Sequence, residues 1–368
     1  MTHGPEFWLD KIHAVQEPAN SLRIMNVCGG HERTISRAGL RKALPAWLQL
    51  IPGPGCPVCV CPEEDIRAAI QLALRGDVIL AAFGDMLRVP CNAPKRQLRS
   101  LQEAQALGAH VVAIASPAEV LELAKTNPRK NIVFFAAGFE TTAAPLAALL
   151  SAHLPNNLQV LLSLRQTWPA VAHLLDSGEI AFDALIAPGH VATVMGAEQW
   201  RFIPERHALP TAVAGFTPAL LLQAIHSVLA QHLENRPTLD NCYPQSVKPD
   251  GNPRARQLLA ETFEIENANW RGIGVLPQSG FGCKSHLAHC DARLYYPEVF
   301  QEVNRTQTDM PAGCDCAAVI LGKITPPQCK LYGTGCKPAN PIGPCMVSEE
   351  GSCRIWWSSG VTTQQRRA

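Results

Sequence analysis

The chain has 368 residues, of which 47% are hydrophobic and 17% are charged, and its formal net charge is +1. This length predicts roughly two or three domains, and the balanced charge without a basic stripe argues against a nucleic-acid partner. No apolar run approaches the roughly 18 residues that span a bilayer, and the N-terminus lacks a signal-peptide pattern, so we expect a cytoplasmic protein with no membrane partner. In that compartment the 14 cysteines indicate metal ligands and redox thiols.

Residues 1–20 predict a short amphipathic helix and a linker. From residue 22 an apolar strand pattern repeatedly ends in a glycine-containing loop, after which a helical pattern follows. The predicted strands are residues 22–27, 48–51, 78–83, 110–115, 131–137, 158–164, 184–187 and 211–214. The predicted helices are residues 33–44, 63–75, 117–125, 168–177, 219–234 and 253–264. This alternation predicts parallel sheets in an α/β fold.

The strands fall into two runs, which favours two similar α/β domains facing a cleft over a single eight-stranded barrel. The charged, turn-rich residues 126–130 look like the boundary between the domains. From about residue 237 the alternation stops, and proline, asparagine and glycine become frequent. The expected domains are therefore residues 21–127, residues 128–236, and an irregular cysteine-rich domain of residues 237–368 together with residues 1–20.

The carboxyl ends of parallel strands lie at one edge of a sheet, where open α/β sheets bind their ligands. Polar and thiol side chains in the loops after the predicted strands should therefore share a cleft. These residues are Cys28, His31, Cys56, Cys59, Asp85, Glu140, Thr141, Thr142 and His190. Several have an ordinary alternative, because Asp85 and a threonine of the G-F-E-T-T turn could cap helices, and His190 could be a turn histidine.

The loop at residues 53–62 holds a C-x-x-C pair, Cys56 and Cys59, among three prolines and two glycines. Pro62 and the acidic residues after it open a predicted helix, whose N-terminus favours thiolates. The pair could be inert packed thiols, but the stiff loop beside a helix N-terminus favours a redox couple. Cys61 is expected to be a buried partner or a helix cap.

Cys28 ends a predicted strand and is followed by two glycines and His31. The glycines allow a ligand or another backbone to come close. A lone cysteine and histidine commonly serve packing or capping, yet thiolate and imidazole also suit an iron or zinc centre.

Four cysteines near the C-terminus have the spacing C-x14-C-x6-C-x16-C: Cys314, Cys329, Cys336 and Cys353. The sequence around them is poor in regular structure and needs an external organiser, such as a four-thiolate metal site. Long irregular gaps favour an iron–sulfur cluster over zinc, because zinc ribbons usually bring C-x2-C knuckles. Unligated thiols are the third alternative, and Cys316 or Cys345 could replace a neighbour as ligand.

Together these motifs resemble the HypD family of [NiFe]-hydrogenase maturation proteins. The resemblance is carried by C-G-G-H at 28–31, G-P-G-C-P-V-C-V at 53–60, F-G-D-M-x-R-V-P at 83–90, G-F-E-T-T at 138–142, A-P-G-H-V at 187–191 and the C-terminal cysteine spacing. It runs from about residue 22 to 357. The chain departs from the family pattern at Glu32 and Arg33, where the family usually has T-H, and at Cys91, where it usually has glycine. Further cysteines that look like additions are Cys61, Cys283 and Cys290.

The resemblance implies two α/β domains facing a cleft and a third domain that carries a [4Fe–4S] cluster. It implies a scaffold that works with a small HypC-type chaperone and assembles an iron carrying cyanide and carbon monoxide, with a HypE–HypF-type pair as the cyanide donor. Matched residue by residue, it makes Cys28 the candidate iron ligand and Cys56 and Cys59 the redox dithiol. The implied cluster ligands are Cys314, Cys329, Cys336 and Cys353, and the implied cleft residues are His31, Glu140, Thr141, Thr142 and His190.

We therefore expect an assembly factor with redox-active thiols rather than a conventional turnover enzyme. Cys28 and a partner's thiolate would hold iron, and the cluster would feed electrons to the Cys56–Cys59 couple. Two alternatives stay open at this point: an iron–sulfur-dependent reductase of protein disulfides, which would not need Cys28, and a zinc-stabilised interaction module with no redox role. The sequence assigns no role to Cys91, Cys242, Cys283 or Cys290.

Overall fold

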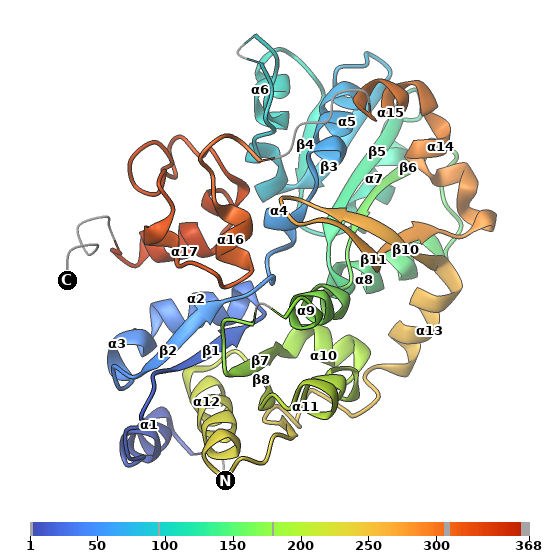
Figure 1. Ribbon diagram of the computed structural model, residues 1–368. Coiled ribbons are helices and arrows are strands. Elements are labelled where there is room, and N and C mark those ends of the chain that lie inside the picture. Colours follow the sequence, from blue (N-terminus) through green and yellow to red (C-terminus); the bar gives the residue numbers. More distant parts are fainter. Residues whose placement is uncertain (1–2, 95, 179, 305–309, 362–368) are drawn as a thin grey trace.

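The computed structural model describes residues 3–94, 96–178, 180–304 and 310–361. Within these residues the core of the fold consists of two parallel sheets (Figure 1). The first has the strand order β2-β1-β7-β8-β9, with β1 Leu22–Asn26, β2 Leu48–Pro52, β7 Ala184–Pro188, β8 Thr211–Ala214 and β9 Leu239–Asn241. The second has the order β4-β3-β5-β6, with β3 Val78–Phe83, β4 Val111–Ile114, β5 Asn131–Gly138 and β6 Leu158–Leu164. The α/β prediction is confirmed, and every predicted strand is present.

The strands are distributed between the sheets differently from the prediction. β1 pairs with β7, with Ile24 opposite Ala184, so strands from both predicted α/β domains share one sheet. The second sheet is built from residues 78–164 alone and is inserted between the two halves of the first. The expected division at residues 127/128 is therefore wrong for the sheets. Apolar runs in the sequence indicate where strands lie. Because these runs closely resemble one another, they do not indicate which two distant strands will pair in a sheet.

Helices follow the strands and cover the sheets. In the first half of the chain they are α1 Pro5–His13, α2 Gly29–Arg37, α3 Leu40–Ala43, α4 Pro57–Val60, α5 Glu63–Ala73, α6 Leu101–Ala106, α7 Glu119–Thr126, α8 Glu140–Leu150 and α9 Thr167–Asp176. The later ones are α10 Gly189–Met195, α11 Phe202–His207, α12 Pro218–Leu233, α13 Pro253–Thr262, α14 Ala292–Tyr295, α15 Pro297–Asn304, α16 Cys316–Ile320 and α17 Ser352–Ser358. The single helix predicted at 33–44 is divided, because Gly39 adopts a φ of 65° between α2 and α3.

Local chemistry starts several of these helices. The Thr217 side chain accepts a hydrogen bond from the Leu220 N–H at 3.3 Å, and Pro218 occupies the first position of α12. Asn252 caps α13 in the same way, through the Ala255 N–H at 3.1 Å. Parallel strands must be covered on both faces, and every residue of β6 is buried accordingly.

The N-terminal helix does not join the C-terminal domain as expected. Helix α1 packs against α12, and Ile12 is fully buried in the apolar core of the first sheet together with Trp8 and Leu9. The apolar stripe of α1 was visible in the sequence, but its packing partner is the apolar surface of α12 and not the C-terminal domain. Within the described residues, no helix is both long and apolar enough to cross a bilayer.

The C-terminal third contains more regular structure than its composition suggested. Strands β10 Phe263–Trp270 and β11 Gly274–Cys283 form an antiparallel hairpin within residues 237–368, which were expected to be irregular. A Cβ added at Gly280 would lie 2.6 Å from the Cβ of Ala268, so this glycine allows the two strands to approach. The final segment, residues 310–361, is irregular apart from short helices, as predicted. It lies beside α2 and α4 (Figure 1), since α17 packs against α2 and the 3-10 turn η5 Pro344–Met346 packs against α4.

Candidate functional site

Two cysteine loops meet at the ends of neighbouring strands β1 and β2. The N–H of Gly29 donates to the carbonyl of Gly55 at 3.0 Å, and the N–H of Gly53 donates to the carbonyl of Asn26 at 2.8 Å. A Cβ on Gly55 would lie only 2.4 Å from the backbone nitrogen of Cys28. Glycine is therefore required for this backbone contact, and it places Cys28 beside the residue before Cys56.

Cys28 occupies the N-cap position of α2 and is half-buried. Burial raises the pKa of its thiol to about 12, although the N–H groups of His31 and Gly30 hydrogen-bond to the sulfur, and the Glu350 carboxylate adds to the rise. The free thiol is therefore protonated near neutral pH. A bound metal ion would displace that proton, because a coordinating thiol ionises outright.

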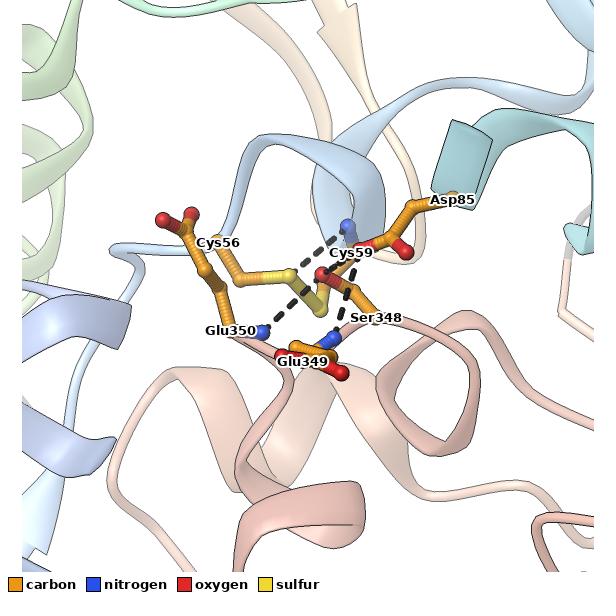
Figure 2. The surroundings of a disulfide bond; sticks show 6 residues. All are labelled: Cys56, Cys59, Asp85, Ser348, Glu349 and Glu350. Carbon is orange, nitrogen blue, oxygen red and sulfur yellow. Dashed lines mark hydrogen bonds between the residues drawn. A yellow bond between two sulfur atoms is a disulfide. The ribbon is translucent and has the colours of Figure 1, made fainter. Parts of the chain in front are cut away.

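Cys56 and Cys59 form a disulfide, with their Cα atoms 5.3 Å apart (Figure 2). Cys56 caps the one-turn helix α4, and its sulfur accepts a hydrogen bond from the Cys59 N–H at 3.2 Å. The helix predicted to begin after Pro62 is α5, so the pair lies on a separate turn before it. Both cysteines are buried, at 3% and 1% exposure.

A turn from the C-terminal segment, residues 348–350, completes this region. Asp85, in the 3-10 turn η1 Gly84–Arg88, accepts hydrogen bonds from the Ser348 hydroxyl at 2.8 Å and from the Glu349 N–H at 3.2 Å. The Glu350 N–H donates in turn to the Ser348 oxygen at 3.1 Å. Figure 2 shows this turn beside the disulfide. Asp85 thus anchors the C-terminal segment rather than capping the helix that follows.

Glu32 and Arg33, the two departures from the family pattern, also hold the C-terminal segment. Glu32 is buried and accepts hydrogen bonds from the Trp356 indole at 2.6 Å and from Arg41 at 2.6 and 2.8 Å. Arg33 pairs with Glu349. Sequence reasoning missed these contacts; their signal in the sequence was the charged pair directly after His31.

His31 and His190 are brought together by an aromatic ring that sequence reasoning did not single out. Phe216 stacks on His190 with ring centroids 3.6 Å apart and lies 4.7 Å from the His31 ring. Burial lowers the pKa of His31 to about 3, so the ring is neutral, and its Nε2 lies 3.1 Å from the carbonyl of Ala214. A carbonyl requires a donor, so Nε2 carries the hydrogen. Nδ1 is then an acceptor, and it has no partner within the described residues.

The G-F-E-T-T turn is arranged differently from the prediction. Phe139 occupies the N-cap of α8 without any side-chain cap, so the predicted threonine cap is wrong. Glu140 is fully buried and accepts hydrogen bonds from the N–H and the hydroxyl of Thr167, both at 2.7 Å. Burial raises its pKa to about 7. Thr141 is exposed, and Thr142 packs so closely on Gly138 that a Cβ there would lie 2.3 Å from the threonine Cβ.

The C-terminal cysteines gather in one core. The sulfurs of Cys314 and Cys316 lie 3.3 Å apart, and Cys316 also hydrogen-bonds to Cys345 and Cys353. The same apolar core holds the disulfide loop: its buried cysteines are Cys56, Cys59, Cys61, Cys91, Cys316, Cys329, Cys336, Cys345 and Cys353. Cys345 lies in η5, which packs against α4. Cys316 and Cys345, expected only as possible replacements, therefore belong to this group of thiols, and Cys345 lies on the turn that packs against α4.

These cysteines suit an iron–sulfur cluster chemically. Cys336 accepts a hydrogen bond from the Ile342 N–H at 3.3 Å, as thiolate ligands commonly do. A Cβ on Gly343 would lie 2.4 Å from the Cys314 sulfur, so glycine at this position lets the backbone pass close to that sulfur. In the part of the chain that the structure describes, no three His, Cys, Asp or Glu side chains are already arranged around a point that would hold a metal ion. As a donor set, four of these thiols would suit an iron–sulfur cluster.

Other cysteines have local partners or lie elsewhere in the structure. Cys61 is buried and lies 3.3 Å from the Ser163 hydroxyl, which agrees with its expected role as a buried partner. Cys242 is buried in the core of the first sheet. Cys283 and Cys290 hydrogen-bond to each other at the end of β11.

Comparison with known proteins gives one consistent family. The family model described as "HypD: Hydrogenase formation hypA family" matches residues 6–360. A hydrogenase maturation factor HypD2 of Bradyrhizobium diazoefficiens is 38% identical over 97% of this chain and 95% of its own length. A hydrogenase expression/formation protein HupD of Azotobacter chroococcum and a hydrogenase maturation factor HypD of Azotobacter vinelandii are each 39% identical over 97% of this chain and 94% of their own lengths.

Proposed function

The chain belongs to the HypD family of hydrogenase formation proteins, and from that premise we propose that it is a scaffold and redox factor for the iron centre of a [NiFe]-hydrogenase. The iron, which carries cyanide and carbon monoxide, is the cargo. A small HypC-type chaperone would share the iron, and a HypE–HypF-type pair would donate the cyanide. Activity would reside in the assembly with these partners.

The contact between the two cysteine loops carries this proposal. The Gly29–Gly55 hydrogen bond and the absent side chain at Gly55 hold Cys28 against the loop of the Cys56–Cys59 disulfide. A single soft thiol next to a two-electron thiol couple suits an iron that must be bound and chemically modified in one place. A zinc-stabilised interaction module with no redox role would need no such juxtaposition.

Cys28 is the proposed iron ligand on this chain. Its thiol is protonated when free, so iron binding would release one proton and leave a thiolate. A second thiolate from the chaperone would complete a soft pair, which stabilises low-spin iron. The neutral His31 ring lies three residues away, and its Nδ1 could accept a hydrogen bond during loading.

Cys56 and Cys59 are the proposed redox couple. Their S–S bond breaks when the pair takes up two electrons and two protons, which leaves two thiols next to Cys28. A [4Fe–4S] cluster held by Cys314, Cys329, Cys336 and Cys353 would supply these electrons one at a time. The shared core of the loop and the C-terminal cysteines supports this route.

The test is anaerobic co-purification of the full chain with its partners from the native host, followed by infrared spectroscopy and iron analysis. Wild type is expected to show cyanide and carbonyl stretches. Cys28→Ala should lose them and keep its iron–sulfur content. The matched control is Cys283→Ala, which removes another half-buried free thiol and should behave as wild type. Equal iron capture by the Cys28 variant contradicts the proposal.

Reduction of other proteins' disulfides is the second candidate. It would use the same thiol couple and cluster without Cys28. The burial of Cys56 and Cys59 disfavours it, because a protein substrate must reach the sulfur that it exchanges with. Turnover of a generic disulfide substrate by the Cys28→Ala variant would favour this candidate. Loss of all turnover in that variant would argue against it.

A further inference from the structure

Arg271 is a buried guanidinium at the junction of three segments. It follows β10, and its side chain is fully buried, at 0% exposure. Its N–H donates to the carbonyl of Val60 at 3.0 Å, and its Nη2 donates to Glu63 at 2.5 Å and to the carbonyl of Pro90 at 2.8 Å. The residue therefore ties the hairpin to the end of α4, the start of α5 and the segment after η1.

Two of the three guanidinium nitrogens are unused by these contacts. Within the described residues, its Nε and Nη1 atoms are buried and have no hydrogen-bond partner. Buried donors nearly always find an acceptor, and arginine cannot discard its charge. The three N–H bonds on these two nitrogens therefore call for an acceptor that the protein atoms do not provide.

The surroundings of the guanidinium include two buried thiols. Its positive charge acts to lower the pKa of Cys61 and Cys91, whose burial has the larger and opposite effect. Both thiols belong to the apolar core that also holds the cysteines of the C-terminal segment.

The backbone next to Arg271 is packed directly against the cysteine segment. Gly272 has a φ of 75°, and a Cβ there would lie 2.8 Å from the Cβ of Ala317 in α16. Ala317 follows Cys316 and lies three residues after Cys314. Glycine at this position lets the arginine approach the cysteine segment more closely than any other residue would.

An anionic sulfur centre supplies what Arg271 lacks. A four-thiolate iron–sulfur cluster carries net negative charge, gains another negative charge on reduction, and has sulfur atoms that accept N–H hydrogen bonds. We propose, resting on the proposed function above, that Arg271 is a positioning residue for that cluster: its free N–H groups donate to sulfur on the Cys314 side, and its charge makes reduction easier. Reduction here adds one electron from an external reductant, and no bond is formed or broken.

The test is a redox titration of the full chain, reconstituted anaerobically and reduced stepwise with dithionite, with the reduced cluster followed by electron paramagnetic resonance. Arg271→Gln should make reduction at least tenfold less favourable, a shift of about 59 mV to more negative potential. Glu63→Gln removes the carboxylate that compensates Arg271 and should shift the potential in the opposite direction. Arg165→Gln is the matched control, because this arginine is also buried and ion-paired, with Asp65, and should leave the potential unchanged.

The outcomes separate the two proposals. If the wild-type chain loads a cluster and Arg271→Gln has the same reduction potential, the role of Arg271 is overturned and the proposed function stands. A wild-type chain that binds no iron and sulfide overturns both. If Arg271→Gln does not fold or does not load, the Glu63→Gln variant decides: an upward shift supports the inference, and an unchanged potential overturns it.

Discussion

Replacing Gly55 with alanine should separate the two cysteine loops. The new methyl group would lie 2.4 Å from the nitrogen and 2.5 Å from the Cα of Cys28, and 2.6 Å from the carbonyl carbon of Val27. All three are backbone atoms at the end of a central strand, so no side-chain rotation relieves the clash. The loop of Cys56 and Cys59 has to move away from Cys28.

The cost follows from the same contacts. Overpacking by one methyl group typically destabilises a folded protein by 1–3 kcal/mol. The Gly29–Gly55 hydrogen bond would also be strained or lost, which removes about 1 kcal/mol more. We therefore expect the free energy of unfolding to fall by about 2–4 kcal/mol. Iron capture at Cys28 should fall further than folding alone explains, because the thiol couple no longer lies beside it.

Urea unfolding of the full chain measures the change in the free energy of unfolding. Anaerobic iron analysis, at a urea concentration where wild type and Gly55→Ala are both folded, measures the change in iron capture. Gly76→Ala is the control, because no atom lies within 4 Å of its added methyl group. That variant should be neutral or slightly stabilised, since alanine lowers the entropy of the unfolded chain. If Gly55→Ala unfolds with the same free energy as Gly76→Ala, the argument that these loops are in backbone contact is wrong.

Two further changes test other parts of the site. Gly343→Ala places a methyl group 2.4 Å from the Cys314 sulfur and 2.6 Å from the Cys316 sulfur. Iron retention should therefore weaken on the order of ten- to a hundredfold. The control is Gly335→Ala, whose methyl group would have no contact closer than 3.5 Å and which should retain iron as wild type does. Glu140 has a folded pKa of about 7, above its ordinary value of 4.5, so its stabilising protonated form is lost as pH rises through 7. Wild type should therefore lose about 2.5 kcal/mol of unfolding free energy between pH 5 and pH 8 from this group, whereas Glu140→Gln should not. The measurement is urea unfolding as a function of pH, and the control is Glu122→Gln, which changes an exposed carboxyl. If the unfolding free energy of wild type and of Glu140→Gln depends equally on pH, the buried Glu140 carboxyl is not the cause of the loss.

The positions of the strands could be predicted, and their partners could not. Apolar runs such as residues 131–137 and 158–164 have the length and borders of buried strands, and both are present as β5 and β6. The pairing of Ile24 with Ala184 joins residues 160 positions apart. Only the folded packing of helices on both faces selects that neighbour. A glycine-rich strand such as β11 was missed because its glycines serve close approach to β10 rather than a turn.

The candidate site divides in the same way. Residues that the motifs single out directly, such as Cys28 and the Cys56–Cys59 pair, lie together because consecutive parallel strands end side by side. Contacts from the C-terminal segment could not be predicted. Asp85 and Ser348 are 263 positions apart, and Trp356 reaches Glu32 across 324 positions. Neither pair leaves a pattern in a single sequence.

The ten-residue loop at 53–62 joins the two halves of the proposed chemistry. On one side Gly55 is in backbone contact with the residues around Cys28. On the other, α4 packs against η5, which holds Cys345, and shares an apolar core with the C-terminal cysteines. The N–H of Arg271 also bonds to the end of α4, at Val60. A displacement of this loop must therefore disturb the iron thiol and the electron donor together, so variants in it should lose both functions, whereas variants at Cys28 or Arg271 should affect one of them.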